Sequence, residues 1–328
     1  MKRFTIIFLS VFLIACTPQA TSIPTSQPTS TPARLIPTPR YNAPAAGKIV
    51  ATATRLTVTL EAAATRDGTS MPASREASTV ETQTETETPI PDEWMELPVL
   101  PDPDESIREI YERGMSLGND PNAFSIFGDC QTRPAEFFGV FETDPLVLES
   151  LTAELRETVE HFNGSFNRES PTSQDGATPG ALLWDQWHRG EYGCAFSETP
   201  VECELRIHRP SFVIIQIGTH FESRNTEYLR KIITQLIDAG VVPILATKAD
   251  NRELDDRINR DMATLADEFN VPLWNFWASL SDLPDRGLFI MDGREEQGAV
   301  YLNDEAQEIH RITGLEALNI VWRVATGQ

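Results

Sequence analysis

Two patterns of apolar residues occur over the last two thirds of the chain. Short, almost wholly apolar runs predict strands buried on both faces, at 123–127, 212–217, 241–246 and 271–276. Apolar residues that recur every three or four positions predict helices at 103–117, 146–161, 225–239, 253–269 and 303–325. The stretch 163–209 has neither period and is expected to be irregular. Strands that alternate with helices predict an α/β fold, a three-layer α/β/α arrangement around an open parallel sheet.

The first sixteen residues have the pattern of an export signal. Lys2 and Arg3 precede the apolar run 4–15, which is too short to span a membrane. The segment Leu13-Ile14-Ala15-Cys16 resembles the bacterial lipobox, which implies that residues 1–15 are a lipoprotein signal peptide and that Cys16 is lipidated. An ordinary secretory signal with an incidental cysteine, or a buried helix, is the alternative. We therefore expect an exported, extracytoplasmic protein that contacts the cell membrane only through its lipid anchor.

The next part of the chain is poor in residues that could form a core. Residues 17–92 contain 17 Thr, 10 of the 23 Pro and a single aromatic residue, Tyr41. Such a segment cannot bury enough apolar surface to offset the entropy lost on ordering. The composition predicts a disordered tether over 16–94 and a globular domain over 95–328.

The charge of the chain excludes one class of function. The whole chain has 27 Lys and Arg against 49 Asp and Glu, and residues 93–328 have 19 against 42. A nucleic-acid-binding protein needs a cationic face, so no nucleic-acid partner is expected, and polyanionic substrates are disfavoured. The sequence also lacks the common zinc and nucleotide motifs, and we expect neither a metal nor a cofactor.

Polar residues and glycines follow the predicted strands, where ligands bind in parallel sheets. Gly128-Asp129-Cys130 follows the first strand and Gly218-Thr219-His220 follows the second. This order resembles the SGNH, or GDSL-type, hydrolase family over roughly residues 122–325. The resemblance implies a flavodoxin-like SGNH fold and hydrolysis of acyl or carbohydrate esters, with a small-molecule or glycan ester as substrate.

The family motifs place candidate residues on this sequence. Cys130 stands at the position of the nucleophilic serine and His220 at the position of an asparagine that stabilises the oxyanion. A thiolate is an intrinsically good nucleophile, and an imidazole can donate a hydrogen bond to an oxyanion. A helix expected to start at Cys130 would stabilise its thiolate. Asp129 and Gly218 flank these two positions as binding residues.

Three further positions complete the candidate site. A second family block supplies a glycine N–H, for which Gly176 and Gly180 are the candidates, and Asn251 follows the third strand as a binding residue. Loop glycines form turns more often than they donate to an oxyanion, so the choice between Gly176 and Gly180 stays open.

The last family motif is altered. The family has Asp-X-X-His before its final helix, whereas this chain has Asp292 with no histidine three residues later, and Tyr301 stands where the general base is expected. Tyrosine, with a pKa near 10, is a poor base at neutral pH. His220 is the best remaining candidate for a base. The other histidines, His161, His188, His208 and His310, have structural explanations at least as good as catalytic ones.

The cysteines and tryptophans leave alternatives open. Cys194 and Cys203 flank a short loop and are expected to form a disulfide, which would leave Cys130 as either a reactive thiol or a small buried side chain. Tryptophans that could line a sugar-binding cleft or pack in the core are Trp184, Trp187, Trp274 and Trp277. Two functions follow: an ester hydrolase at the cell surface, or an inactive SGNH-like lipoprotein that binds glycans or cell-envelope components.

Overall fold

The structure is a computed structural model that describes residues 93–188, 190–218 and 226–328. The predicted signal peptide, Cys16, most of the predicted tether, and His220 lie outside these ranges. The described chain begins with the 3-10 helix η1 (Glu93–Glu96), where Trp94 is buried and packs edge-on against Trp277. The packed region thus includes Trp94, which the predicted boundary at 95 assigned to the tether. No helix within the described ranges is long and apolar enough to cross a membrane.

Four parallel strands form the central sheet, in the spatial order β1-β2-β3-β4. Their bounds are β1 (Asp120–Gly128), β2 (Pro210–Gln216), β3 (Val242–Ala246) and β4 (Leu273–Trp274). The register pairs Phe127 with Ile215, and Ile215 with Leu245, so the apolar runs lie side by side. Every residue of β2 and β3 is buried, as expected for strands covered on both faces. The predicted α/β fold with a parallel sheet is confirmed.

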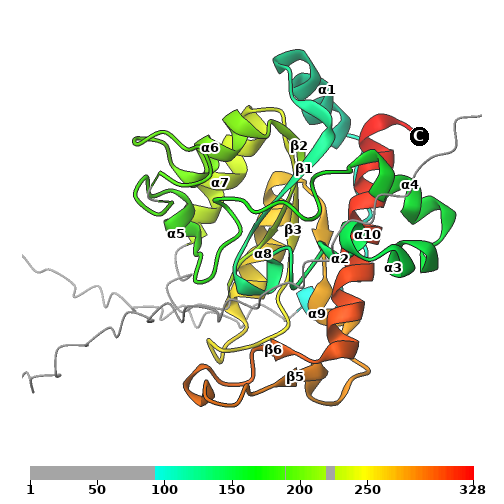
Figure 1. The fold of residues 1–328 in the computed structure, drawn as a ribbon, viewed down its shortest axis with the longest axis vertical. Coiled ribbons are helices and arrows are strands. Elements are labelled where there is room, and N and C mark those ends of the chain that lie inside the picture. Colours follow the sequence, from blue (N-terminus) through cyan, green and yellow to red (C-terminus); the bar gives the residue numbers. More distant parts are fainter. Residues whose placement is uncertain (1–92, 189, 219–225) are drawn as a thin grey trace, which may run out of the picture. The chain divides into compact units, whose positions relative to one another are not determined.

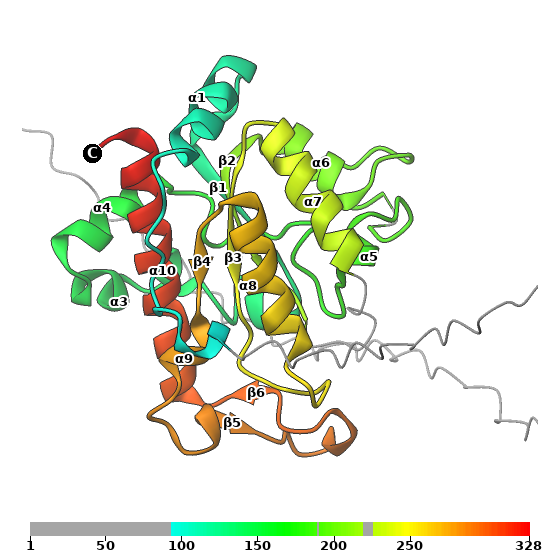
Figure 2. The same cartoon turned by 180° about the vertical axis from the view of Figure 1, so that it is seen from behind.

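Helices pack on both faces of this sheet (Figures 1 and 2). On one face lie α1 (Ile107–Leu117), α4 (Ala153–His161) and α10 (Asp304–Thr326), and on the other lie α6 (Pro200–Ile207), α7 (Thr226–Asp238) and α8 (Arg257–Phe269). Neighbouring side chains of a strand point to opposite faces. Phe124 and Ile126 therefore join the core beneath α10, whereas Phe127 joins the core beneath α7 and α8.

The helix predicted over 146–161 is broken in two. The first part, α3 (Pro145–Ser150), ends at Leu151, and α4 begins after Thr152, whose Oγ1 accepts a hydrogen bond from the N–H of Leu155. Leu151 and Leu155 nevertheless enter the same core, so the apolar spacing continues across the break. A threonine that caps a new helix competes with continuation of the old one, and this local bond overrides the period.

The stretch 163–209, predicted to be irregular, contains two short helices, α5 (Pro179–Leu182) and α6. The start of α6 is a capping box, in which Thr199 and Glu202 each accept a hydrogen bond from the other's N–H. Pro200 occupies the first helical position. The tetrapeptide Thr-Pro-Val-Glu is a helix-start signal that hydrophobic periodicity does not detect.

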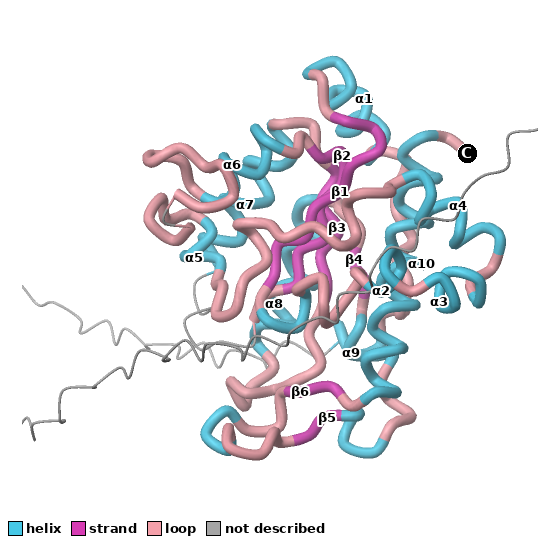
Figure 3. Tube along the Cα trace, in the orientation of Figure 1, coloured by secondary structure: helices cyan, strands magenta, loops and turns pink. Residues whose placement is uncertain are grey.

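A small antiparallel hairpin lies beyond the carboxyl ends of the parallel strands (Figure 3). Its strands are β5 (Leu288–Phe289) and β6 (Tyr301–Leu302), and Phe289 pairs with Tyr301. The hairpin leads directly into α10. The shorter helices are η2 (Cys130–Thr132), α2 (Val140–Thr143), α9 (Phe276–Ser279), η3 (Pro284–Gly287) and η4 (Glu295–Gln297). The sequence pattern did not predict the hairpin, which forms one wall of the site.

Candidate functional site

Cys130 lies where the sequence places it, immediately beyond the carboxyl end of β1. A Cβ at Gly128 would lie 1.9 Å from the Thr132 hydroxyl oxygen, so close packing requires glycine there. The helix that starts at Cys130 is only the three-residue η2. The expectation that a helix N-terminus stabilises a Cys130 thiolate is therefore wrong, because so short a turn sums very few peptide dipoles.

Asp129 joins the ends of β1 and β2. Its side chain is buried, with Oδ1 accepting a hydrogen bond from the N–H of Gln131 at 3.2 Å and Oδ2 accepting one from the N–H of Gly218 at 3.3 Å. A Cβ at Gly218 would lie 2.5 Å from the side chain of Ile258, so a larger residue does not fit. Asp129 and Gly218 are thus brought together, and they fix the backbone around Cys130.

A hollow of about 570 Å³ opens beside Cys130, and we call it the Cys130 hollow. Polar side chains line both of its walls. The wall near the sheet includes Gln131, Arg133 and Asp175, whereas the hairpin and its loop contribute the apolar Phe289, Met291 and Leu302 and the polar Arg294, Gln297 and Tyr301. The Gln131 side chain donates a hydrogen bond to the Val300 carbonyl, which ties the two walls together. The hollow can hold a small ligand with both polar and apolar faces.

Tyr301 lines the same hollow, directly before α10. Its hydroxyl donates a hydrogen bond to Gln297 at 2.6 Å and accepts one from the Arg294 guanidinium at 3.1 Å. This hydroxyl is therefore part of a polar rim formed with two neighbours from the hairpin loop. Asp292 is exposed and is not one of the lining residues, so the structure does not bring it to Cys130.

The environment of Cys130 favours the neutral thiol. Burial, reinforced by the carboxylates of Asp129 and Asp175, raises the pKa of the Cys130 thiol from 9.0 to about 12. Desolvation and neighbouring negative charge both disfavour a thiolate. At neutral pH the sulfur is protonated, and a thiol is a weak nucleophile.

The four histidines within the described residues are all engaged away from the hollow, and none of them lines it. Their ring nitrogens form hydrogen bonds elsewhere: His161 to the Pro121 carbonyl, His188 to the Glu198 carbonyl, His208 to the Phe124 carbonyl and His310 to the Gln216 side chain. Burial lowers the pKa of His310 to about 3, so this imidazole is neutral. The role predicted for His220 stays a prediction, because that residue lies outside the described ranges.

Of the two candidate glycines, only Gly176 lies at the Cys130 hollow. It has a φ of +78° and follows Asp175. Gly180 packs instead against the ring of Tyr228, which a Cβ would approach to 3.3 Å. Asn251 is exposed, and its side chain accepts a hydrogen bond from the N–H of Asp256 at 3.1 Å. The structure thus places Asn251 in a loop turn and not in the lining of the hollow.

A buried charged cluster behind Gly218 was not predicted. Lys248 is 2% exposed, and its ammonium donates hydrogen bonds to Asp250 at 2.7 Å and to Glu253 at 2.6 Å. The polar run Lys-Ala-Asp-Asn-Arg-Glu directly after a buried strand is the sequence signal for it. Pairing allows these three charges to be buried at the carboxyl end of β3.

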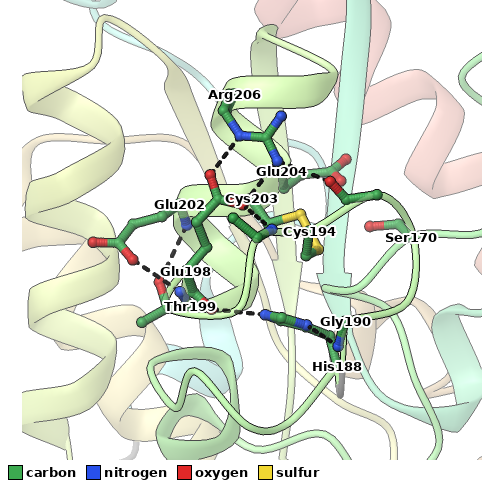
Figure 4. The surroundings of a disulfide bond; sticks show 12 residues. Ser170, His188, Gly190, Cys194, Glu198, Thr199, Glu202, Cys203, Glu204 and Arg206 are labelled. Carbon is green, nitrogen blue, oxygen red and sulfur yellow. Dashed lines mark hydrogen bonds and ion pairs between the residues drawn. A yellow bond between two sulfur atoms is a disulfide. The ribbon is translucent and has the colours of Figure 1, made fainter.

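Cys194 and Cys203 form the predicted disulfide (Figure 4). It joins the long loop after α5 to α6. On either side of it, His188 bonds to the Glu198 carbonyl, and Arg206 pairs with the Glu198 carboxylate. Within the described residues, Cys130 is the free cysteine. The loop after α5 is therefore fixed by a covalent bond and by several polar contacts.

No family model matches the chain, and no curated protein matches it significantly. The site must be interpreted from its own residues. Within the described ranges, no group of three or more His, Cys, Asp or Glu side chains is placed to hold a metal ion.

Proposed function

We propose that this protein is a surface lipoprotein whose SGNH-like domain binds a neutral glycan in the Cys130 hollow without hydrolysing it. The export signal and lipobox-like segment at Cys16 support the location. The observation that carries the proposal is that Cys130, whose thiol is protonated, and Tyr301 line the same hollow. These are the nucleophile and base positions of the resembled family, and they hold a thiol whose pKa is raised by burial and a phenol in place of an imidazole.

The strand order supports the resemblance to SGNH proteins. Gly128 forms a parallel bridge with Ser173, so a short segment runs along the outer edge of β1. Counted as the second strand along the chain, this segment gives the flavodoxin-like order 2-1-3-4-5. In that order the switch point lies between β1 and β2, where Asp129 meets Gly218, and ligands bind at such points. Helices on both faces agree with three layers.

The lining of the hollow suits an uncharged polar ligand. Although the domain is strongly acidic, the charged residues of the lining balance: Arg133 and Arg294 face Asp175 and Glu136. Amide, guanidinium and phenol groups can bond sugar hydroxyls, while Phe289 and Leu302 offer apolar surface to the C–H face of a sugar ring. A neutral sugar matches both walls, whereas a polyanion would be repelled by the rest of the domain.

Two measurements on the purified protein test this proposal. On an array of neutral glycans, with and without O-acetyl groups, we expect binding that falls at least about tenfold in Arg294→Ala, or about 1.4 kcal/mol. Arg156→Ala, on α4, is the matched control and should bind like the wild type. With a panel of aryl esters and acetylated sugars, we expect the wild type to turn over no faster than Cys130→Ala. Absence of glycan binding would refute the proposal.

One observation keeps hydrolysis as a second candidate. Cys130 is unbridged and lines the hollow, so its sulfur is not sealed inside the core. In this candidate His220 takes the proton of the Cys130 thiol as the sulfur attacks the ester carbonyl and returns it to the alcohol that leaves; water then hydrolyses the thioester, which releases the acid and restores the thiol. Ester turnover that is lost in both Cys130→Ala and His220→Ala, and unchanged in His161→Ala, would favour hydrolysis over binding alone.

A further inference from the structure

The exposed aromatic side chains of the domain are not scattered. Within the described residues, the aromatic side chains that are exposed are Trp184, Phe196, Tyr228 and Phe289. An exposed large apolar ring forgoes roughly 1.5–3 kcal/mol of the free energy that its burial would contribute, so a group of such rings marks an interaction surface. All four line one run of connected hollows.

The hollows connect through shared residues. Gly176 lines both the Cys130 hollow and a neighbouring hollow of about 730 Å³ that Trp184, Trp187 and Tyr228 also line. Trp184 and Trp187 in turn line a third hollow, of about 620 Å³, which ends at Phe196. Adjoining hollows therefore lead from Cys130 past Gly176 to an aromatic region, which we call the Trp184 shelf (Trp184, Trp187, Phe196 and Tyr228).

Few charged groups border the Trp184 shelf, and one of them is the Lys231 ammonium, which lies 5.8 Å from the centroid of the Tyr228 ring. None of the residues lining its middle hollow is charged, and Asp185 is the one charged residue among those lining its outer hollow, in the part of the chain that the structure describes. Gln186 adds a neutral polar group beside the rings. Flat rings with few charges fit the C–H faces of successive neutral sugars, with hydroxyls directed to solvent.

The shelf is also held in place. The disulfide between Cys194 and Cys203 spans the segment that carries Phe196, and the His188 ring bonds both to the Glu198 carbonyl and to the N–H of Gly190 (Figure 4). On the other side, glycine at 180 lets the Tyr228 ring lie against the backbone of α5. A surface that is fixed before binding loses less entropy when a ligand arrives.

We infer that the Trp184 shelf is a set of sugar-stacking subsites that continue the Cys130 hollow, so that the ligand is an extended neutral oligosaccharide. The inference rests on the proposed function and specifies its ligand class. The sugar in the Cys130 hollow makes the polar contacts, and the following sugars stack on Trp187 and Trp184. Affinity must therefore rise with chain length.

Calorimetric titration with ladders of one to six sugars, built from β-1,4-linked glucose, xylose or N-acetylglucosamine, tests this inference. We expect the wild type to bind the longest members at least about tenfold more tightly than the monosaccharide, or about 1.4 kcal/mol. Trp184→Ala should abolish this gain with length, and Trp184→Phe should restore most of it. Leu146→Ala, which removes an exposed apolar side chain on α3, is the control and should have no effect.

The outcomes separate the two proposals. Glycan binding on the array with affinity independent of length and of Trp184 would overturn the shelf and leave the proposed function standing. Loss of binding at every length in Arg294→Ala, with length dependence lost only in Trp184→Ala, supports both. Binding of a synthetic peptide of the proline-rich residues 24–44 at Trp184, in place of oligosaccharides, would also overturn the shelf.

Discussion

The protonation state of Cys130 is the property on which the choice between binding and catalysis depends. Its pKa of about 12 lies three units above the ordinary value of 9.0, because the thiol is largely desolvated and faces the Asp129 and Asp175 carboxylates. At pH 7 the fraction present as thiolate is therefore about a thousandfold smaller than for an ordinary cysteine. Alkylation should be slower by a similar factor, since iodoacetamide reacts with the thiolate.

The assay follows carbamidomethylation of the peptide that contains Cys130 by mass spectrometry, in native protein and in protein unfolded by urea. In the unfolded protein the rate should level off above about pH 9. In the native protein it should keep rising about tenfold per pH unit through pH 10, because the thiol is still far below its pKa. The pH profile separates a raised pKa from mere inaccessibility, which lowers the rate equally at every pH.

A single substitution tests whether neighbouring carboxylates raise the pKa of Cys130. Asp175→Asn removes one of the negative charges that raise the pKa of Cys130, so the native alkylation rate at pH 8 should increase. Asp267→Asn, on the exposed face of α8, is the matched control and should leave the rate unchanged. Rapid labelling of native Cys130 at pH 6, or a profile that levels off below pH 8, would refute this reasoning and favour a catalytic thiolate.

Two further predictions concern the supports of the fold. Glu204 is fully buried and pairs with Arg168 and Ser125, so Arg168→Met should lower the free energy of unfolding in urea by about 3–5 kcal/mol. The more exposed cation Arg133 is the control, and Arg133→Met should cost at most about 1 kcal/mol; equal losses would contradict the assignment. His310 is buried with a pKa of about 3, below its ordinary 6.5, so unfolding takes up a proton. The contribution of the neutral, buried His310 to the free energy of unfolding is complete above pH 6.5, and it falls by about 1.4 kcal/mol per pH unit as the pH drops toward 4. His310→Gln should flatten that slope relative to the wild type, and identical slopes would refute the prediction.

Periodicity was sufficient for the elements that bury a continuous apolar face. The runs at β2 and β3 and the amphipathic faces of α7, α8 and α10 correspond to structure within a few residues. Where periodicity predicted the wrong helix boundaries, local hydrogen bonds determine where the helices begin and end. The cap at Thr152 divides a helix whose apolar spacing is unbroken, and the capping box at Thr199 starts one where no period is visible.

The candidate site was only half accessible from sequence. Cys130, Asp129 and Gly218 could be placed because strand ends converge at one edge of a parallel sheet. Arg294 and the hairpin wall could not be placed, since β5 and β6 are two residues long and pair only in the context of the whole domain. The raised pKa of Cys130 also depends on burial, which a linear motif does not encode.

The covalent link between Cys194 and Cys203 governs how the protein must be prepared. Cys194 and Cys203 are buried when they are joined. A chain that folds in a reducing cytosol has two free thiols there instead, at the ends of the segment that carries Phe196. Either of them can form a disulfide with a thiol of another molecule once air is admitted during purification. Expression through a secretion route, or oxidation before the first column, avoids that scrambled species. Otherwise, a negative ligand screen on cytosolic material cannot be distinguished from the effect of incorrect disulfides.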